Sequence, residues 1–185
     1  MPSTPSNQRG SAQGGEHARA VQTGAINIDP ATRLLIESNA EPRWGQFLRT
    51  WECLATAKGR YPSRTEIDPA ALGAKLLPNV FLADVVKEAG RKQPRFRFRL
   101  LGQVILDREP TRSGDYLDVL GPAGDLAPIT HHYQACIDGQ VWIREASLTW
   151  HGERRGYLRY KVMMLPLSDD GETVTQLIGL ALYEF

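Results

Sequence analysis

The sequence predicts an α+β fold, in which a five-stranded antiparallel sheet carries helices on one face and a further helix precedes the first strand. Two observations support this prediction. Five strand-like runs are joined by short links, with two runs before a helical stretch and three after it. A helical pattern with a bulky apolar stripe precedes the first run. The chain has 185 residues, which is enough for one domain with a core and an extension.

Charge and hydropathy limit the classes of partner. The chain has 22 Lys and Arg against 21 Asp and Glu, so no long-range field concentrates a polyanion, and nucleic acid is not an expected partner. No apolar run approaches the ~18 residues of a membrane helix, and residues 1–25 lack the apolar segment of a signal peptide. We therefore expect a cytoplasmic protein without a membrane span. Cys53 and Cys136 lie outside any CxxC or Cys/His cluster, so we expect buried, unreactive thiols and no zinc site.

The first part of the chain divides into a tail and a helix. Residues 1–25 are rich in Ser, Gly, Gln and Pro and contain no aromatic residue, which predicts a disordered tail. Between residues 42 and 58, Trp44, Phe47 and Trp51 recur at helical spacing, and Gly59 is a plausible stop. This segment is predicted to be an amphipathic helix.

The first two strands follow a capped helix. Asp68 followed by Pro69 has the form of a helix start, and Pro78 is expected to end that helix. Residues 79–88 and 94–102 read as two strands joined by "AGRKQ", a connection of hairpin length. The second strand alternates apolar side chains with arginines, so we expect Phe96, Phe98 and Leu100 to face inward.

The remaining strands form a meander after a longer helix. That helix is predicted over residues 126–140, and the strands over 141–150, 156–167 and 174–185, with "HGERR" and "SDDGET" as turns. The last run is apolar on both parities, so both of its faces are expected to be buried. The helix at 42–58 is the available cover, either for its own sheet or for the sheet of a dimer partner.

This layout resembles a PAS domain, and in particular the single-domain bacterial PAS family that is the fifth of the catalogued PAS families. The resemblance rests on "GRYPSRTEIDPAAL" (59–72), "LLPNVFLADV" (76–85), "RFRFRLLG" (95–102), "SGDYLDVL" (113–120) and "YLRYKVMMLPLSDDG" (157–171). It covers residues 41–185, which we take as one PAS domain. It implies a PAS fold, a sensor or interaction module, and a homodimer, without naming a signal. The chain departs from the family at Gln103, Glu109, Pro110 and Arg112, near the helical side of the expected cavity.

The resemblance places a candidate cavity on the inward face of the sheet. The candidate ligand-binding residues are Phe98, Gln103, Tyr116, Tyr133, Tyr160 and Met164. Small-molecule sites are usually concave and mostly apolar with a few polar groups, although packing in the core is the alternative role for each of these residues. The residues around 104–106 and 115–119 would form the opposite wall. The candidate interaction surface consists of Trp44, Phe47, Trp51, Arg97 and Arg99, and we expect Arg95, Arg97, Arg99, Arg159 and Lys161 to share one face on adjacent strands.

Cofactor and enzyme signals are weak. His131 and His132 open the predicted long helix, but a histidine without a supporting motif does not predict heme, and no cysteine has the context of a flavin-binding site. No nucleophile elbow, phosphate loop or zinc-protease motif is present. We therefore expect a stand-alone PAS-type regulatory protein that binds a small molecule and signals through contact with a protein partner. A ligand-free interaction scaffold is the first alternative, and a small enzyme is the second.

Overall fold

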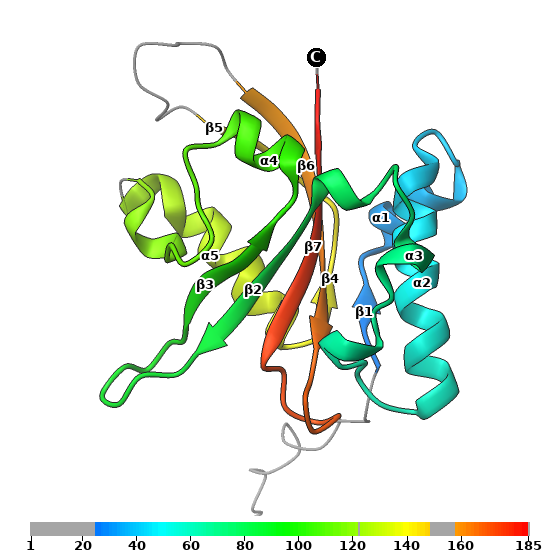
Figure 1. Ribbon diagram of the computed structural model, residues 1–185, viewed down its shortest axis with the longest axis horizontal. Helices are drawn as coiled ribbons and strands as arrows, with labels where there is room; N and C mark the ends of the chain where they lie inside the picture. The colour runs from blue at the N-terminus through cyan, green and yellow to red at the C-terminus, as the bar shows by residue number, and fades with distance from the viewer. Residues whose placement is uncertain (1–24, 122, 149–157, 185) are drawn as a thin grey trace, which may run out of the picture.

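A computed structural model describes residues 25–121, 123–148 and 158–184. The predicted tail at 1–25 falls almost wholly outside the described residues. Five strands form one antiparallel sheet, in the order β3-β2-β7-β6-β5 (Figure 1). The strands are β2 (Val80–Val86), β3 (Arg95–Leu101), β5 (Arg144–Leu148), β6 (Leu158–Leu167) and β7 (Gln176–Tyr183). The predicted α+β class is confirmed, and the sheet with helices inserted between β3 and β5 is consistent with a PAS fold.

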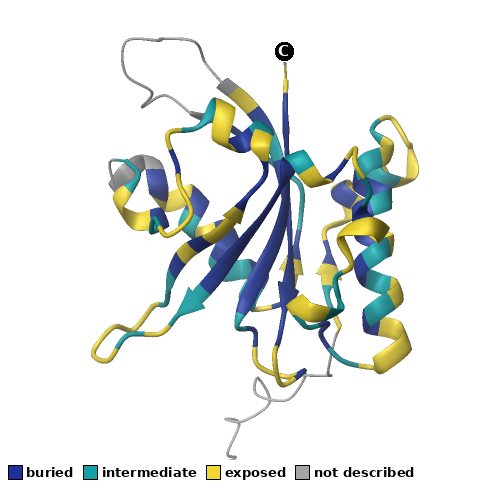
Figure 2. Cartoon of the chain, viewed as in Figure 1, coloured by how far each residue is buried: buried dark blue, intermediate teal, exposed yellow. Residues whose placement is uncertain are grey.

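Two groups of helices lie on opposite sides of the sheet (Figure 1). The first group consists of α1 (Pro30–Glu37), α2 (Pro42–Lys58) and α3 (Pro69–Leu72). The second consists of α4 (Gln103–Arg108) and α5 (Ala123–Ile137), with a 3₁₀ turn, η3 (Leu117–Val119), between them. Two further 3₁₀ turns, η1 (Arg64–Glu66) and η2 (Leu77–Asn79), flank α3. Figure 2 shows β7 as a buried strand in the middle, and each of its eight residues is buried.

Helix α2 covers the sheet of its own chain. Its bounds coincide with the predicted helix, and Gly59 ends it in the left-handed conformation (φ 61°), which glycine adopts without steric cost. Trp44, Phe47 and Trp51 are 1%, 1% and 3% exposed. The Trp51 indole Nε1 donates a hydrogen bond of 2.8 Å to the Pro166 carbonyl of β6. These three side chains are therefore part of the core of this chain and are not presented on its surface.

Several short elements differ from the prediction. Helix α3 ends at Leu72, well before Pro78, because Gly73 adopts a positive φ of 77°, and the proline lies in the turn η2. Strand β1 (Asn27–Ile28) pairs in parallel with β4 (Gln140–Val141), and α1 follows β1. Strands of two residues carry no readable period, so the sequence does not predict this small second sheet.

The apolar face of β3 shifts by one residue at its end. Leu82 pairs with Leu100 and Ala83 with Phe98, which leaves Arg99 as the extra residue of a β-bulge. Leu100 is consequently 41% exposed, while Leu101 is buried. The prediction that Leu100 faces inward was wrong, because simple alternation cannot anticipate a bulge.

The basic residues of the sheet do not form one stripe. Strands β3 and β6 are separated by β2 and β7, so the prediction that their arginines and lysines lie on adjacent strands was wrong. Arg97 lies 2.9 Å and Arg99 3.5 Å from the carboxylate oxygens of Asp84. Lys161 pairs with Glu184 at 3.2 Å. Several of these charges are therefore balanced locally by carboxylates.

The two cysteines lie in different environments. Cys136 is buried, but Cys53 is exposed on α2, so the expectation that both thiols are buried was wrong for Cys53. Cys53 holds a position of α2 that points away from the sheet.

No helix in the described parts of the chain is long and apolar enough to cross a membrane.

Candidate functional site: a cavity between the sheet and the inserted helices

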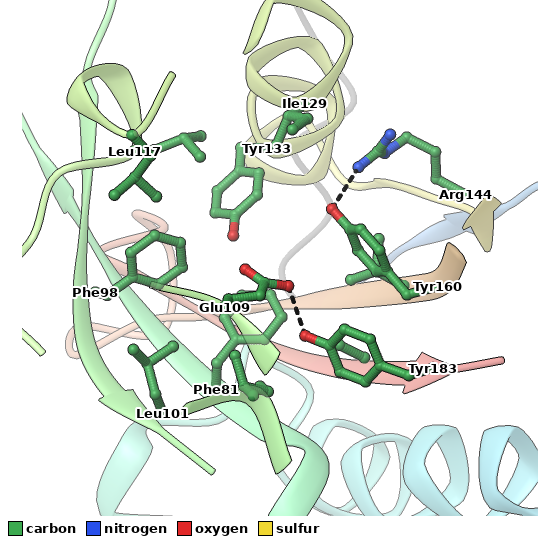
Figure 3. A pocket seen from close by; sticks show the side chains of 14 residues that line it. Phe81, Phe98, Leu101, Glu109, Leu117, Ile129, Tyr133, Arg144, Tyr160 and Tyr183 are labelled. Atoms are coloured by element: carbon green, nitrogen blue, oxygen red, sulfur yellow. Dashed lines mark hydrogen bonds between the residues drawn. The ribbon is translucent and has the colours of Figure 1, made fainter. Parts of the chain in front are cut away.

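A small cavity lies between the sheet and the helical insert, with a volume of about 40 Å³. Figure 3 shows side chains from β2, β3, β5, β6 and β7 of the sheet, together with side chains from η3 and α5 and with Glu109, which follows α4. The lining residues are Phe81, Phe98, Leu101, Ile105, Glu109, Leu117, Leu120, Ile129, Tyr133, Arg144, Tyr160, Val162, Ala181 and Tyr183. Most of this wall is apolar, with one carboxyl, one guanidinium and three phenol groups. That composition is typical of a small-molecule site.

Helix α4 carries Glu109 to the cavity because its start is pressed against the turn η2. A Cβ atom at Gly102 would lie 2.3 Å from the Pro78 carbonyl oxygen, so only glycine permits this approach. The Gly102 amide donates a hydrogen bond of 2.8 Å to the Val80 carbonyl, which fixes the start of α4 to β2. Pro110 follows Glu109 directly, and the short helix ends there. The carboxylate of Glu109 therefore points across the cavity toward β7 (Figure 3).

The hydrogen bond between Glu109 and Tyr183 is the shorter of the two polar contacts described in the cavity. The Tyr183 hydroxyl donates to Glu109 Oε1 at 2.5 Å. Burial raises the pKa of Glu109, and the hydrogen bond from Tyr183 offsets only part of that rise. Burial, followed by the Glu109 charge, also raises the pKa of Tyr183. Both groups are thus shifted toward their neutral forms.

Arg144 and Tyr160 form a second polar pair. Arg144 Nη2 donates to the Tyr160 hydroxyl at 3.3 Å (Figure 3). The Nε atom of the same guanidinium is buried and has no hydrogen-bond partner among the described residues. Burial, with a smaller contribution from Glu109, raises the pKa of Tyr160 to about 12. The phenol is therefore neutral at physiological pH.

Aromatic rings fix the remaining shape of the cavity. Phe81 lies edge-on to Phe98 at 6.0 Å and stacks on Tyr133 at 6.1 Å between centroids. Tyr160 and Tyr183 are tilted neighbours at 5.5 Å. Such ring pairs contribute stability beyond their area of burial, so they favour this arrangement of the wall. Burial raises the pKa of Tyr133 well above its ordinary value.

The structure brings together half of the candidate ligand-binding residues. Phe98, Tyr133 and Tyr160 line the cavity. Gln103 is exposed on α4, where its amide donates to Asp107 Oδ1 at 2.7 Å. Tyr116 lies under the Arg95 guanidinium, 3.8 Å from Cζ to the ring centroid. Met164 is fully buried farther along β6 and does not line this cavity.

Three polar residues of the cavity were not among the candidates: Glu109, Arg144 and Tyr183. In the sequence, Glu109 stands out only as a departure from the PAS pattern, and that departure is the available signal. Arg144 lies in a run read simply as a strand, and Tyr183 in a run read as apolar on both parities. Nothing in the sequence indicated that these segments meet.

The two histidines of α5 differ in environment. His131 is exposed, whereas the ring of His132 is buried and its Nε2 lies 3.1 Å from the Trp142 carbonyl oxygen. Burial, and then the neighbouring Arg144 charge, lowers the pKa of His132 to about 3. The described residues contain no group of three or more His, Cys, Asp or Glu placed to hold a metal ion. His151 lies outside the described residues.

Comparisons with known proteins add little to this geometry. No protein-family profile and no curated protein matches the chain. Among solved structures, the chain is similar to a fungal LOV domain photoreceptor described in connection with blue light and oxidative stress, at 12% identity and a TM-score of 0.38. The match covers 81% of this chain and 99% of the other. Because that similarity is low, the fold assignment rests on the strand order and the inserted helices.

Proposed function

We propose that this chain is a PAS-type sensory module whose cavity takes a small molecule and whose output is contact with a protein partner. The observation that carries this proposal is the cavity itself, where a carboxyl, a guanidinium and three phenols converge within an otherwise apolar wall. Buried polar groups are costly unless they are satisfied, so natural proteins keep few of them in a core without a reason. A ligand that completes their hydrogen bonds supplies that reason.

The cavity is connected to elements that can carry a signal. Glu109 follows α4, while its partner Tyr183 lies on β7 in the middle of the sheet. A ligand that competes for Glu109 would weaken the link between α4 and the sheet. The chain would then have two arrangements, one with α4 linked to the sheet and one without that link. The ligand shifts the population of the two arrangements only if it binds one better than the other. The exposed Arg97 and Arg99 on β3 remain the proposed contact surface for a partner.

The proposal also covers the family and the oligomeric state of the chain. We propose that the chain belongs to the single-domain bacterial PAS family, that it is cytoplasmic and that it forms a homodimer. Trp44, Phe47 and Trp51 are buried within one chain, so they cannot form the dimer contact unless α2 leaves its sheet. Dimer contact through another surface is therefore part of the proposal.

A ligand-free scaffold is the second candidate, and the small cavity volume favours it. At about 40 Å³ the cavity is far below the range of roughly 300–1,000 Å³ typical of sites for drug-sized ligands. An enzyme is a weaker candidate. The raised pKa values keep the tyrosines protonated, so they can donate hydrogen bonds but are poor bases.

The test compares masses under native and denaturing conditions for freshly purified protein. A small molecule that is retained in the native state and released on unfolding supports the sensor. The matched control is Ala181→Leu, because Ala181 lines the cavity and a bulkier side chain fills it. A molecule retained equally by this variant lies elsewhere, and protein that never carries or gains a small molecule supports the scaffold.

A further inference from the structure

We propose that the cavity takes a small monocarboxylate of about one to three carbon atoms, whose carboxylate accepts hydrogen bonds from Arg144 and whose alkyl part lies beside Ile129 and Val162. This inference rests on the proposed sensory function and names the chemical class of its ligand. Three properties of the site support it: an unsatisfied buried donor, a missing counter-ion and the size of the space.

The unsatisfied donor is Arg144 Nε. This atom is buried without a hydrogen-bond partner in the described part of the chain, while Nη2 of the same group donates only to a phenol. A buried donor left unpaired is costly, and the cost is larger when the donor is charged. A carboxylate satisfies such a donor best, because its two oxygens match the planar guanidinium.

The missing counter-ion belongs to the same residue. Arg144 makes no ion pair with a described acidic residue, in contrast to Arg95 and Arg97, which pair with Asp118 and Asp84. The neighbouring His132 is uncharged at physiological pH, so it neither repels an incoming anion nor pairs with one. An uncompensated guanidinium beside an apolar cavity attracts an anion more strongly than it would in water.

The volume of the cavity limits the ligand. A cavity that holds one buried water has a volume of roughly 10–15 Å³. A cavity of about 40 Å³ therefore holds a molecule with a few non-hydrogen atoms. Formate, acetate and propionate fall near this size, whereas an aromatic acid does not. The apolar side chains of Ile129 and of Val162, which pairs with Arg144 across β5 and β6, suit a methyl or ethyl group better than a second polar group.

Glu109 decides the pH dependence of binding. Tyr183 from β7 donates to Glu109, and the other titratable or charged groups of the cavity are Tyr160 from β6, Tyr133 from α5 and Arg144 from β5. Arg108, which precedes Glu109 at the end of α4, lies over the Tyr183 ring. The three phenols stay neutral at physiological pH. A bound carboxylate favours the protonated form of Glu109, because two carboxylates repel each other in a dry site. Affinity is therefore expected to fall as pH rises above the pKa of Glu109.

The experiment titrates the full-length chain with ¹³C-labelled acetate and follows binding by saturation-transfer NMR and calorimetry. Acetamide and methylammonium serve as neutral and cationic probes of similar size. We expect acetate to bind, acetamide to bind at least about tenfold more weakly, and methylammonium not to bind. Arg144→Gln is expected to weaken acetate binding roughly ten- to a hundredfold, and Arg144→Lys by less. Arg33→Gln, which removes an exposed arginine of α1, is the matched control and leaves binding unchanged.

The second readout is the pH profile of acetate affinity above about pH 6, where the acid itself is ionised. Wild-type affinity is expected to fall as Glu109 loses its proton, and Glu109→Gln, whose amide stays neutral, is expected to flatten the profile. Equal binding of acetate and methylammonium, or no effect of Arg144→Gln in a variant that is folded by circular dichroism, overturns the inference. If acetate does not bind while another small molecule is retained and released on unfolding, the carboxylate inference is overturned and the proposed sensory function stands. If the protein neither binds acetate nor retains a small molecule, the carboxylate inference and the proposed sensory function are both overturned.

Discussion

Gly179→Ala tests how tightly the sheet and the cavity wall are packed. A Cβ atom at Gly179 would lie 2.1 Å from Cζ and 2.2 Å from Cε1 of Phe81, the residue opposite it on β2. Carbon atoms normally approach to about 3.5–4.0 Å, so the ring must move by more than about 1 Å. Phe98 and Tyr133 hold that ring from two directions. Overpacking of this kind costs about 1–3 kcal/mol, which in a chain of this size lowers Tm by roughly 2–12 °C.

The assay is urea unfolding followed by tryptophan fluorescence and circular dichroism. Gly45→Ala is the matched control. Its new Cβ is crowded by the flexible end of Arg49 at 3.0 Å and makes an ordinary contact with Ile36 Cγ2 at 3.6 Å. Because the change also removes a glycine from a helix, stability is expected to hold or rise. In the double variant Gly179→Ala/Phe81→Leu, the loss in the free energy of unfolding is expected to be smaller than the sum of the losses in the two single variants, by at least about 1 kcal/mol. Wild-type stability in Gly179→Ala, or strictly additive losses, would refute this packing.

Three further predictions concern other parts of the chain. Trp51→Phe leaves the Pro166 carbonyl without its donor and creates a small void, so unfolding in urea should show a loss of about 1–3 kcal/mol. Hydrogen bonds from Arg60 above all lower the pKa of Glu66 to about 2, so this carboxylate contributes stability above about pH 4.5 that is lost as pH falls toward 2. Acid titration of Glu66→Gln should therefore show a flatter loss over that range. A thiol reagent should label the exposed Cys53 quickly and the other, buried cysteine only on unfolding; two fast thiols would contradict the packing of α5.

The sequence predicts those elements whose signals are local. Helix α2 has a long apolar stripe and a glycine stop, and its bounds coincide with those predicted. The strands are bounded by turn residues, so their order along the chain and the α+β class follow from pattern alone. The cap at Asp68 is local too, and its carboxylate accepts the Ala70 amide at 2.9 Å.

The site depends on contacts that no local pattern encodes. Glu109 meets Tyr183 across 74 positions of the chain, and their hydrogen bond arises only when α4 packs against the sheet. The bulge that exposes Leu100 comes from the register between β2 and β3, which alternation does not reveal. Alternation does place Phe98 and Tyr160 correctly, since each lies on the inward side of its strand.

The most direct test of the central claim is a methyl NMR spectrum of the protein recorded with and without a mixture of small organic compounds. The reporters are the methyl groups of Ile105, Leu117 and Ile129, which line the cavity. Leu165 serves as a core control outside the cavity. We predict shifts confined to the cavity methyls and lost in Ala181→Leu. Shifts that persist in that variant, or that gather around Leu165, would contradict the account.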